Sequence, residues 1–289
     1  MANMHHHFVP AFLLREWESG DDKKLTSLRW DRGKVVASRF KAKAVAKRRH
    51  LYATGVAQGR PQNRVETEFM TPHVDNPAAL VHQELLAGRL QELNEEQRRS
   101  WAMFLVAQLV RVPSMVAKVQ FRGQQVLLRG NELVAPDKLQ PGEEQVPLSE
   151  LLKANMPGLF DDLGLDTLPH IMSSQVLNQM FLGATWGVHV VMHTLFDLVI
   201  GDEPLVYEGK MNSNFLFAIP LSPRVLFTAF SDPETGRNLR SASKQKLVVT
   251  FNRSQVDQAD TYVYASTDAQ KNLVVRYLRR PSVTALAQA

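Results

Sequence analysis

Seven polar side chains lie in otherwise apolar stretches of the sequence, and their types could do chemistry together. They are two imidazoles, three carboxylates, an amide and a guanidinium: His6, His7, Glu66, Asp75, Asp202, Gln108 and Arg111. If they converge, His7, Glu66, Asp75 and Asp202 could hold Mg²⁺ or Mn²⁺, which would activate water against a phosphodiester. Arg111 would then brace the phosphate, and His6, His7, Glu66, Gln108, Arg111 and Asp202 would form the catalytic set. The pattern predicts a metal-assisted nuclease or phosphodiesterase.

A second interpretation gives the same residues a structural role. Arg111 lies in an apolar helix, so its side chain should be buried and paired with an acid, Glu66 or Asp202. The cluster would then fix the fold of a non-enzymatic module that binds nucleic acid or a protein partner. In both cases we expect His6 or His7 to lie within hydrogen-bonding or one-water reach of Glu66, Arg111 or Asp202.

The amino-terminal region is strongly basic. Between Arg29 and Arg64 there are eleven Lys or Arg residues and one acid, Asp31, although the net charge of the whole chain is only +5. Closely spaced cations gain affinity for a polyanion by releasing counterions. We therefore predict RNA or DNA binding through Lys41, Lys43, Lys47, Arg48 and Arg49, with a solvated surface segment as the alternative. Trp30, Phe40 and Tyr52 lie among the cations and could either stack on bases or belong to the core.

Other sites are less well supported by the sequence. No glycine-rich phosphate loop of either common type is present, so no nucleotide cofactor is expected. His189 and His193 have the spacing of metal ligands on one helix face but lack the glutamate of a metalloprotease, and we expect core or surface histidines.

Local signals predict the elements that position these residues. Apolar side chains between Phe8 and Trp17 should dock the amino terminus into the core. Asp31-Arg32-Gly33 indicates a β-hairpin with strands 25–30 and 34–38. Helices are predicted over 76–93 and 94–112, the second opened by a capping box of Asn94 and Gln97.

Further along, we predict strands within 119–128 and helices over 148–160 and 173–191. The segments 194–200, 215–219 and 225–230 should form one antiparallel sheet with a helix over 254–264 behind it, and Asp202 should lie in a turn at a strand end. The predicted fold class is α+β, with an amino-terminal β-hairpin, a mainly helical middle and a small antiparallel sheet in the carboxy-terminal third. No linker divides the chain, so a single domain over residues 1–289 is expected.

Composition limits the compartment and the chemistry. The absence of cysteine excludes disulfides and thiolate zinc sites and fits a reducing cytosol. The apolar stretch 181–200 contains His189, His193 and Asp197, which would be costly in a membrane. We expect a soluble, cytoplasmic protein without a signal peptide and without a membrane partner; the oligomeric state is left open.

Six short motifs in order resemble the domain-of-unknown-function family 4238. They span residues 6–266: His6-His7-Phe8-Val9-Pro10, His50-Leu51-Tyr52 with Val65-Glu66-Thr67-Glu68-Phe69, Gln108-Leu109-Val110-Arg111-Val112-Pro113, Gly201-Asp202-Glu203-Pro204, Pro220-Leu221-Ser222-Pro223, and Asn252 to Tyr264. Two departures stand out. An insertion with Pro72 leaves Asp75 where the family tends to have a second glutamate, and Glu203 replaces an asparagine. The resemblance implies no particular activity.

Overall fold

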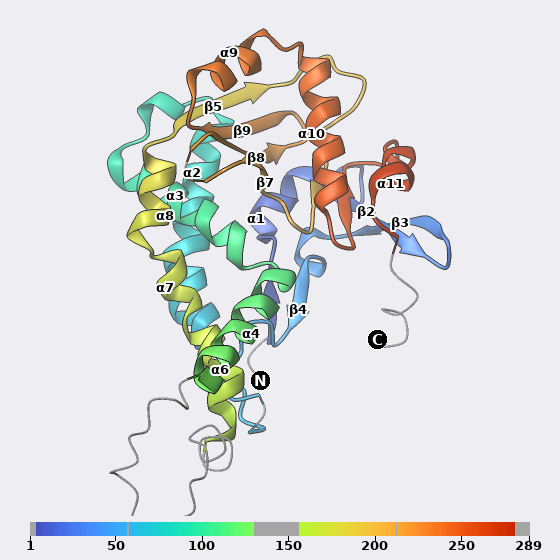
Figure 1. Ribbon diagram of the computed structural model, residues 1–289. Coiled ribbons are helices and arrows are strands. Elements are labelled where there is room, and N and C mark those ends of the chain that lie inside the picture. The colour runs from blue at the N-terminus through green and yellow to red at the C-terminus, as the bar shows by residue number, and fades with distance from the viewer. Residues whose placement is uncertain (1–3, 57, 130–155, 212, 281–289) are drawn as a thin grey trace, which may run out of the picture.

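A computed structural model describes residues 4–56, 58–129, 156–211 and 213–280, and it has the predicted α+β architecture (Figure 1). A body of helices lies beneath a carboxy-terminal four-stranded antiparallel sheet. Two other sheets, one of two strands and one of four, contain the amino-terminal strands. The predicted hairpin, helical middle and carboxy-terminal sheet are all present.

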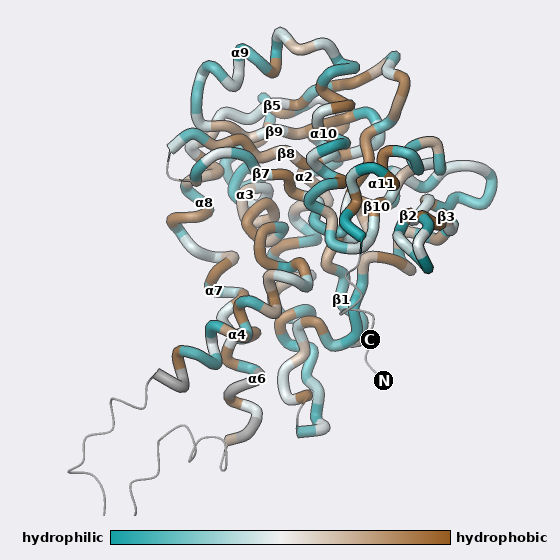
Figure 2. The backbone as a smooth tube through the Cα atoms, turned by 45° about the vertical axis from the view of Figure 1, so that its right-hand side comes forward, coloured by the Kyte–Doolittle hydropathy of each residue, from teal (hydrophilic) through white to brown (hydrophobic). Residues whose placement is uncertain are grey.

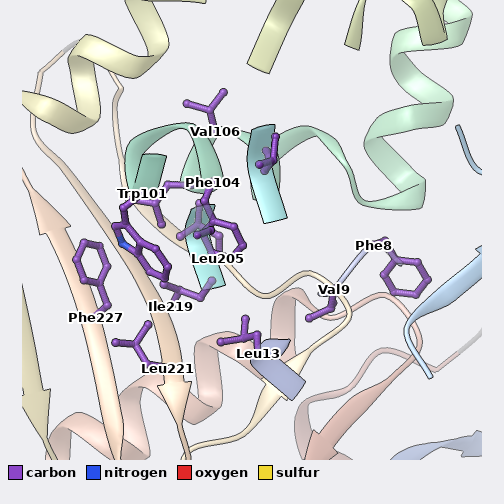
Figure 3. Close-up of a cluster of buried hydrophobic side chains, with 14 of the residues drawn as sticks. Phe8, Val9, Leu13, Trp101, Phe104, Val106, Leu205, Ile219, Leu221 and Phe227 are labelled. Atoms are coloured by element: carbon purple, nitrogen blue, oxygen red, sulfur yellow. The ribbon is translucent and has the colours of Figure 1, made fainter. Parts of the chain in front are cut away.

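The amino terminus is docked, as predicted. Strand β1 (His5–His7) pairs antiparallel with β4 (Lys47–Arg49), with His6 opposite Arg48. Helix α1 (Ala11–Leu14) and a 3₁₀ turn (Arg15–Trp17) follow. Val9, Leu13 and Trp17 are completely buried. They join the core cluster that also contains Trp101 and Phe227, part of which is shown in Figure 3.

The predicted β-hairpin consists of β2 (Leu25–Asp31) and β3 (Lys34–Phe40). Arg32 and Gly33 both have positive φ, at 46° and 82°, as a tight two-residue hairpin turn requires. Two strands from late in the chain, β6 (Ile200–Gly201) and β10 (Val263–Ala265), extend this sheet in the order β3-β2-β10-β6. Helix α11 (Lys271–Tyr277) contacts β2 and β3.

The helical middle begins with a π-helix (Val65–Asp75) that continues directly into α2 (Asn76–Leu86). After a 3₁₀ turn (Leu90–Glu92), α3 (Glu95–Val110) opens with the predicted capping box: Asn94 and Gln97 exchange side-chain to backbone hydrogen bonds, both 2.9 Å long. The chain then forms α4 (Pro113–Arg129), α6 (Pro157–Asp166), α7 (Leu168–Met172) and α8 (Gln175–Leu182).

Two predictions for this region were wrong or only partly testable. The strands expected within 119–128 are instead part of α4, which packs closely on α6. A Cβ atom added to Gly164 would lie 2.4 Å from the Cα of Gln120, so the glycine allows a helix approach that the short apolar runs did not reveal. Of the helix expected over 148–160, residues 148–155 lie outside the described residues.

The carboxy-terminal sheet has the order β5-β9-β8-β7 (Figure 2). Its strands are β5 (Thr185–Val190), β7 (Val206–Gly209), β8 (Phe215–Ser222) and β9 (Val225–Phe230). Phe217, Ile219 and Leu221 face the core cluster, whereas Ala218 packs with Val248 of α10 (Lys244–Gln258) on the other side. The predicted strands 215–219 and 225–230 are confirmed; helix α9 (Pro233–Ser241) follows them.

Three boundaries in the last third were predicted wrongly. The expected helix 173–191 ends at Leu182 and gives way to β5, so His189 lies on a strand and His193 in a left-handed turn. Segment 194–200 contributes only Ile200 to a strand, because Trp17 donates to the Leu198 carbonyl and Asn252 bonds the backbone of Asp197 and Val199. The expected helix 254–264 ends at Gln258, before β10.

Among the described residues, no single helix combines the length and apolarity needed to cross a membrane. In this part of the chain one pair of consecutive helices, α3 and residues 113–126 of α4, is together long and apolar enough, but the two helices are bent by 77° at their junction.

Candidate functional site

Arg111 is the centre of the first polar cluster. It caps the end of α3 and its side chain is fully buried. Its Nη1 donates to Asp75 Oδ1 (2.6 Å), and its Nη2 donates to Asp75 Oδ2 (3.1 Å) and to the backbone carbonyl of His7 (2.7 Å). The predicted hydrogen-bonding reach between His7 and Arg111 is confirmed, although the His7 backbone carbonyl makes the contact and its imidazole does not. The predicted acidic partner, Glu66 or Asp202, was wrong, because the π-helix brings Asp75 to the guanidinium instead.

Tyr52 and His6 complete this cluster, which we call the Arg111 anchor (His6, His7, Tyr52, Glu66, Asp75 and Arg111). The Tyr52 hydroxyl donates to the Arg111 carbonyl (2.7 Å), and its backbone N–H donates to His6 Nδ1 (2.8 Å). The two rings stack with centroids 5.2 Å apart. Burial lowers the pKa of His6 to about 4, so the imidazole is neutral and acts as an acceptor at Nδ1. Tyr52 is a core residue rather than a base-stacking one.

Glu66 and Gln108 are two residues of the predicted site with buried polar atoms that lack hydrogen-bond partners among the described residues. Burial raises the pKa of Glu66 to about 7; the Arg111 charge opposes this rise and Asp75 adds to it. Glu66 Oε2 is buried without a hydrogen-bond partner among the described residues. Gln108 is 2% exposed, and within the described part of the chain both its amide oxygen and its amide nitrogen lack partners. Such groups cost folding free energy.

Asp202 holds a different part of the molecule. Its Oδ1 accepts from the backbone N–H of Asp260, and its Oδ2 accepts from those of Thr261 and Tyr262, all at 2.8 Å. Burial raises the pKa of this carboxyl, while the three N–H groups act in the opposite direction. Asp202 therefore fastens the turn after β6 to the segment before β10.

The four predicted metal ligands do not meet. Asp75 is bonded to Arg111, Asp202 to backbone N–H groups, and the His7 imidazole lies 3.3 Å from the carbonyl of Lys43. In the part of the chain that the structure describes, no three His, Asp or Glu side chains are placed so that they could share an ion.

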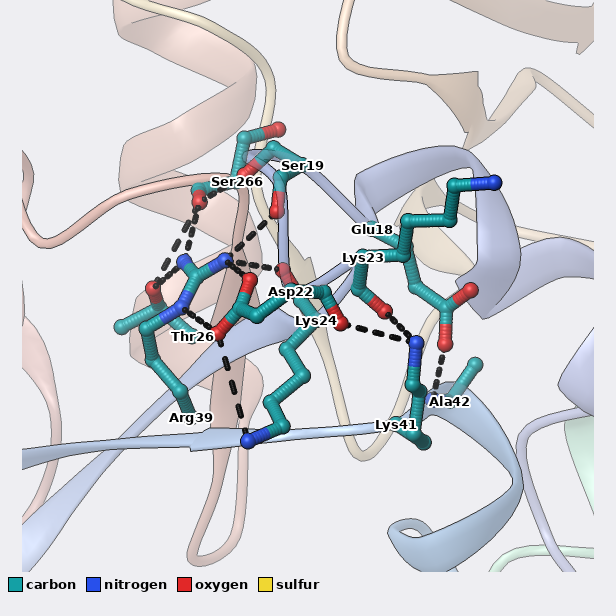
Figure 4. Close-up of polar contacts among 10 residues, drawn as sticks. All are labelled: Glu18, Ser19, Asp22, Lys23, Lys24, Thr26, Arg39, Lys41, Ala42 and Ser266. Carbon is teal, nitrogen blue, oxygen red and sulfur yellow. Dashed lines mark hydrogen bonds and ion pairs between the residues drawn. The ribbon is translucent and has the colours of Figure 1, made fainter.

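Some cations of the basic segment are bonded to other residues of the protein, whereas others form no ion pair within the described residues. Arg39 forms two bonds to Asp22, at 2.6 and 3.0 Å, and Lys41 donates to the carbonyls of Asp22 and Lys23 at 2.8 and 2.7 Å (Figure 4). Both therefore brace the loop before β2. The other four residues predicted to bind nucleic acid form no ion pair within the described residues; they are Lys43, Lys47, Arg48 and Arg49.

A cleft of about 640 Å³, which we call the β4 cleft, extends from two of these cations, Lys47 and Arg48, to the Asp202 turn. Its lining includes Arg29, Lys47 and Arg48, the ring of Phe40, and the segment Asp260–Tyr262. Phe40 is 42% exposed, and Tyr262 stacks on Tyr264 with an interplanar angle of 5°. A second cleft of about 770 Å³ shares Ser114, Glu203, Asp260 and Thr261 with the first and extends to Gln108, Lys118 and Arg280.

Sequence reasoning found the cations of the β4 cleft but missed Asp260 and Tyr262. The backbone of both residues is bonded to Asp202 at the cleft, a contact between residues about sixty positions apart that local sequence does not reveal. The one local signal was the alternation of Tyr262, Val263 and Tyr264, which is typical of a strand with one face open.

The fold and these contacts define an α+β protein that combines a buried arginine anchor with a cleft lined by cations, carboxylates and aromatic rings. A family model described as "Protein of unknown function (DUF4238)" matches residues 5–269, and the chain belongs to this family. No curated protein and no solved structure matches the chain.

Proposed function

We propose that this protein binds single-stranded nucleic acid along the β4 cleft and that the Arg111 anchor is the structural support of that surface. The observation that carries the proposal is the composition of the cleft. Lys47 and Arg48, which form no ion pair within the described residues, lie in one concave surface together with Arg29 and the rings of Phe40 and Tyr262. Binding rather than cleavage is proposed because, among the described residues, no three His, Asp or Glu side chains are placed to share a catalytic metal ion.

Physical chemistry favours a single strand over a duplex as the occupant. Lys47 and Arg48 can neutralise backbone phosphates regardless of sequence. An exposed ring such as Phe40 gains energy by stacking on a base only when that base is unpaired. Strand β4 itself is held by its pairing with β1, whose His7 carbonyl is bonded to Arg111. The cations are therefore presented on a backbone that the anchor keeps in place.

Fluorescence anisotropy with a labelled 12-nucleotide single strand tests the proposal. The wild type should bind with an affinity that falls as salt rises, with a slope of about −0.7 for each phosphate contact. The variant Lys47→Ala/Arg48→Ala should bind at least about tenfold more weakly and show a slope shallower by about 1.4, because two contacts of about 0.7 each are lost.

A matched control is available in α10. Lys244 and Lys246 are exposed and line neither cleft, so Lys244→Ala/Lys246→Ala makes the same change in net charge at another place. This control should bind like the wild type. No binding by the wild type, or an equal loss in both variants, would contradict a specific role for the β4 cleft.

A further inference from the structure

The β4 cleft is not uniformly basic, and its acidic residues call for an explanation. Three carboxylates line it together with the cations: Asp202, Glu203 and Asp260. A surface that only neutralised phosphates would be weakened by negative charge. Their presence indicates a ligand that offers hydrogen-bond donors as well as phosphates.

Two of these carboxylates already accept hydrogen bonds from other residues of the protein. Asp202 accepts three backbone N–H bonds, and Glu203 Oε1 accepts from the hydroxyl of Ser114 at 2.6 Å. Asp260 differs. Its residue is exposed, its only hydrogen-bond donor among the described side chains is the neighbouring Thr261 hydroxyl at 3.1 Å, and the described residues give it no ion pair.

Asp260 is also fixed in position. Its backbone N–H is bonded to Asp202 Oδ1 at 2.8 Å, and the next two N–H groups are bonded to Asp202 Oδ2. The backbone of Asp260 is thus fixed at the boundary between the two clefts, both of which the residue lines. A backbone that is ordered before binding reduces the conformational entropy that is lost when the side chain binds a ligand.

We propose that the β4 cleft selects RNA over DNA, with the Asp260 carboxylate accepting a hydrogen bond from a ribose 2′-hydroxyl. This inference rests on the proposed function and names its substrate class. A ribonucleotide strand carries a hydroxyl donor beside each phosphate, which matches a cleft that has an acceptor beside cations, and the 2′-hydroxyl is the group by which proteins distinguish RNA from DNA. Acidic side chains bind ribose hydroxyls in dinucleotide-binding folds in the same way. A DNA strand meets the same cations but has no 2′-hydroxyl to donate to Asp260, so the carboxylate only repels it.

The test compares strands that differ in the 2′ position alone. Anisotropy is measured for an RNA 12-mer, the same sequence as DNA with deoxyuridine in place of uridine, and its 2′-O-methyl form. The wild type should bind RNA about tenfold more tightly than DNA, as one hydrogen bond to a charged group provides. The 2′-O-methyl strand should bind like DNA, because it has lost the donor.

Asp260→Ala should bring the RNA to DNA affinity ratio close to one, partly by raising the affinity for DNA. Asp257→Ala is the matched control, because Asp257 is an exposed carboxylate three residues earlier that lines neither cleft. It should keep the preference. If the alanine variant melts early, Asp260→Asn replaces it in the same measurement, because asparagine preserves the shape of the side chain. The RNA to DNA affinity ratio of Asp260→Asn should lie between those of the wild type and Asp260→Ala.

The outcomes separate this inference from the proposed function. Equal binding of RNA and DNA by the wild type, or a preference that survives in both Asp260 variants, would overturn the role of Asp260 while leaving the β4 cleft as a nucleic-acid site. If no strand binds the wild type, the proposed function fails first and RNA selection fails with it.

Discussion

Replacing Arg111 with methionine tests the Arg111 anchor directly. The guanidinium is completely buried, whereas the Asp75 side chain is 19% exposed. Breaking a buried pair typically costs about 3–5 kcal/mol, because the remaining charge is uncompensated. Asp75 keeps some access to water, so we expect about 3–4 kcal/mol, part of which is the lost bond to the His7 carbonyl. For a chain of this size that corresponds to a fall in Tm of roughly 6–16 °C.

The assay is urea and thermal unfolding followed by circular dichroism. The double variant Arg111→Met/Asp75→Leu should recover most of the loss, because it leaves no unpaired charge. Arg99→Met, in the same helix, is the control: the Arg99 pair with Glu95 is exposed on both sides, so its loss should change the free energy of unfolding by less than about 1 kcal/mol.

One result would refute a structural anchor. If Arg111→Met unfolds at the wild-type temperature and loses nucleic-acid binding, the guanidinium must contact the ligand instead of Asp75. The bidentate geometry and the complete burial of Arg111 would then not describe the working protein.

Two further predictions concern the polar groups that the fold leaves unsatisfied. The folded pKa of Glu66, about 7, exceeds its usual value of 4.5, so the folded state retains a proton that the unfolded chain has released, and the stability attributable to Glu66 falls as pH rises from about 4.5 through 7. Glu66→Gln should therefore be more stable than the wild type above pH 7, with the gap closing toward pH 4.5; a gap independent of pH in chemical denaturation would contradict the raised pKa. Gln108→Leu should raise Tm, because it removes a buried amide without partners. The control Gln255→Leu should lower Tm, since Gln255 Nε2 donates to the Glu203 carbonyl at 2.7 Å, and a lower Tm for Gln108→Leu would mean that its amide is satisfied.

Features encoded by neighbouring residues could be predicted from the sequence. The capping box of Asn94 and Gln97 involves two residues three positions apart, and the hairpin turn needs only Arg32 and Gly33 to adopt positive φ. The docked amino terminus also belongs here, because six large apolar side chains within ten residues are difficult to expose to water.

Features decided by distant contacts could not be predicted in the same way. Segment 194–200 has the composition of a strand, but side chains of Trp17 and Asn252 occupy its backbone groups, so it cannot join the neighbouring sheet. Residues 260–262 leave the helix because Asp202 binds their N–H groups. Neither partner is close in sequence, and local propensity is overridden by such tertiary contacts.

The candidate site shows the same division. The contact between His7 and Arg111 could be predicted, because the docked amino terminus brings His7 to the core. The acidic partner of Arg111, Asp75, could not be predicted in this way. Glu66 and Asp75 lie on a π-helix, whose wider turn changes which side chains share a face. A prediction based on α-helical spacing cannot place either carboxylate correctly there.

The sheet order β3-β2-β10-β6 has a consequence for synthesis of the protein. Strand β2 pairs with β10, whose residues follow more than two hundred positions later, and the β4 cleft combines Arg29 and Lys47 with Asp260 and Tyr262. Pairing across such a separation forms slowly and only after both strands are available. A nascent chain on the ribosome therefore has its cations long before it has the other wall of the cleft. The proposed binding surface is complete only after residue 265 has emerged, so nucleic-acid binding should report that both walls of the cleft have been translated and have folded together.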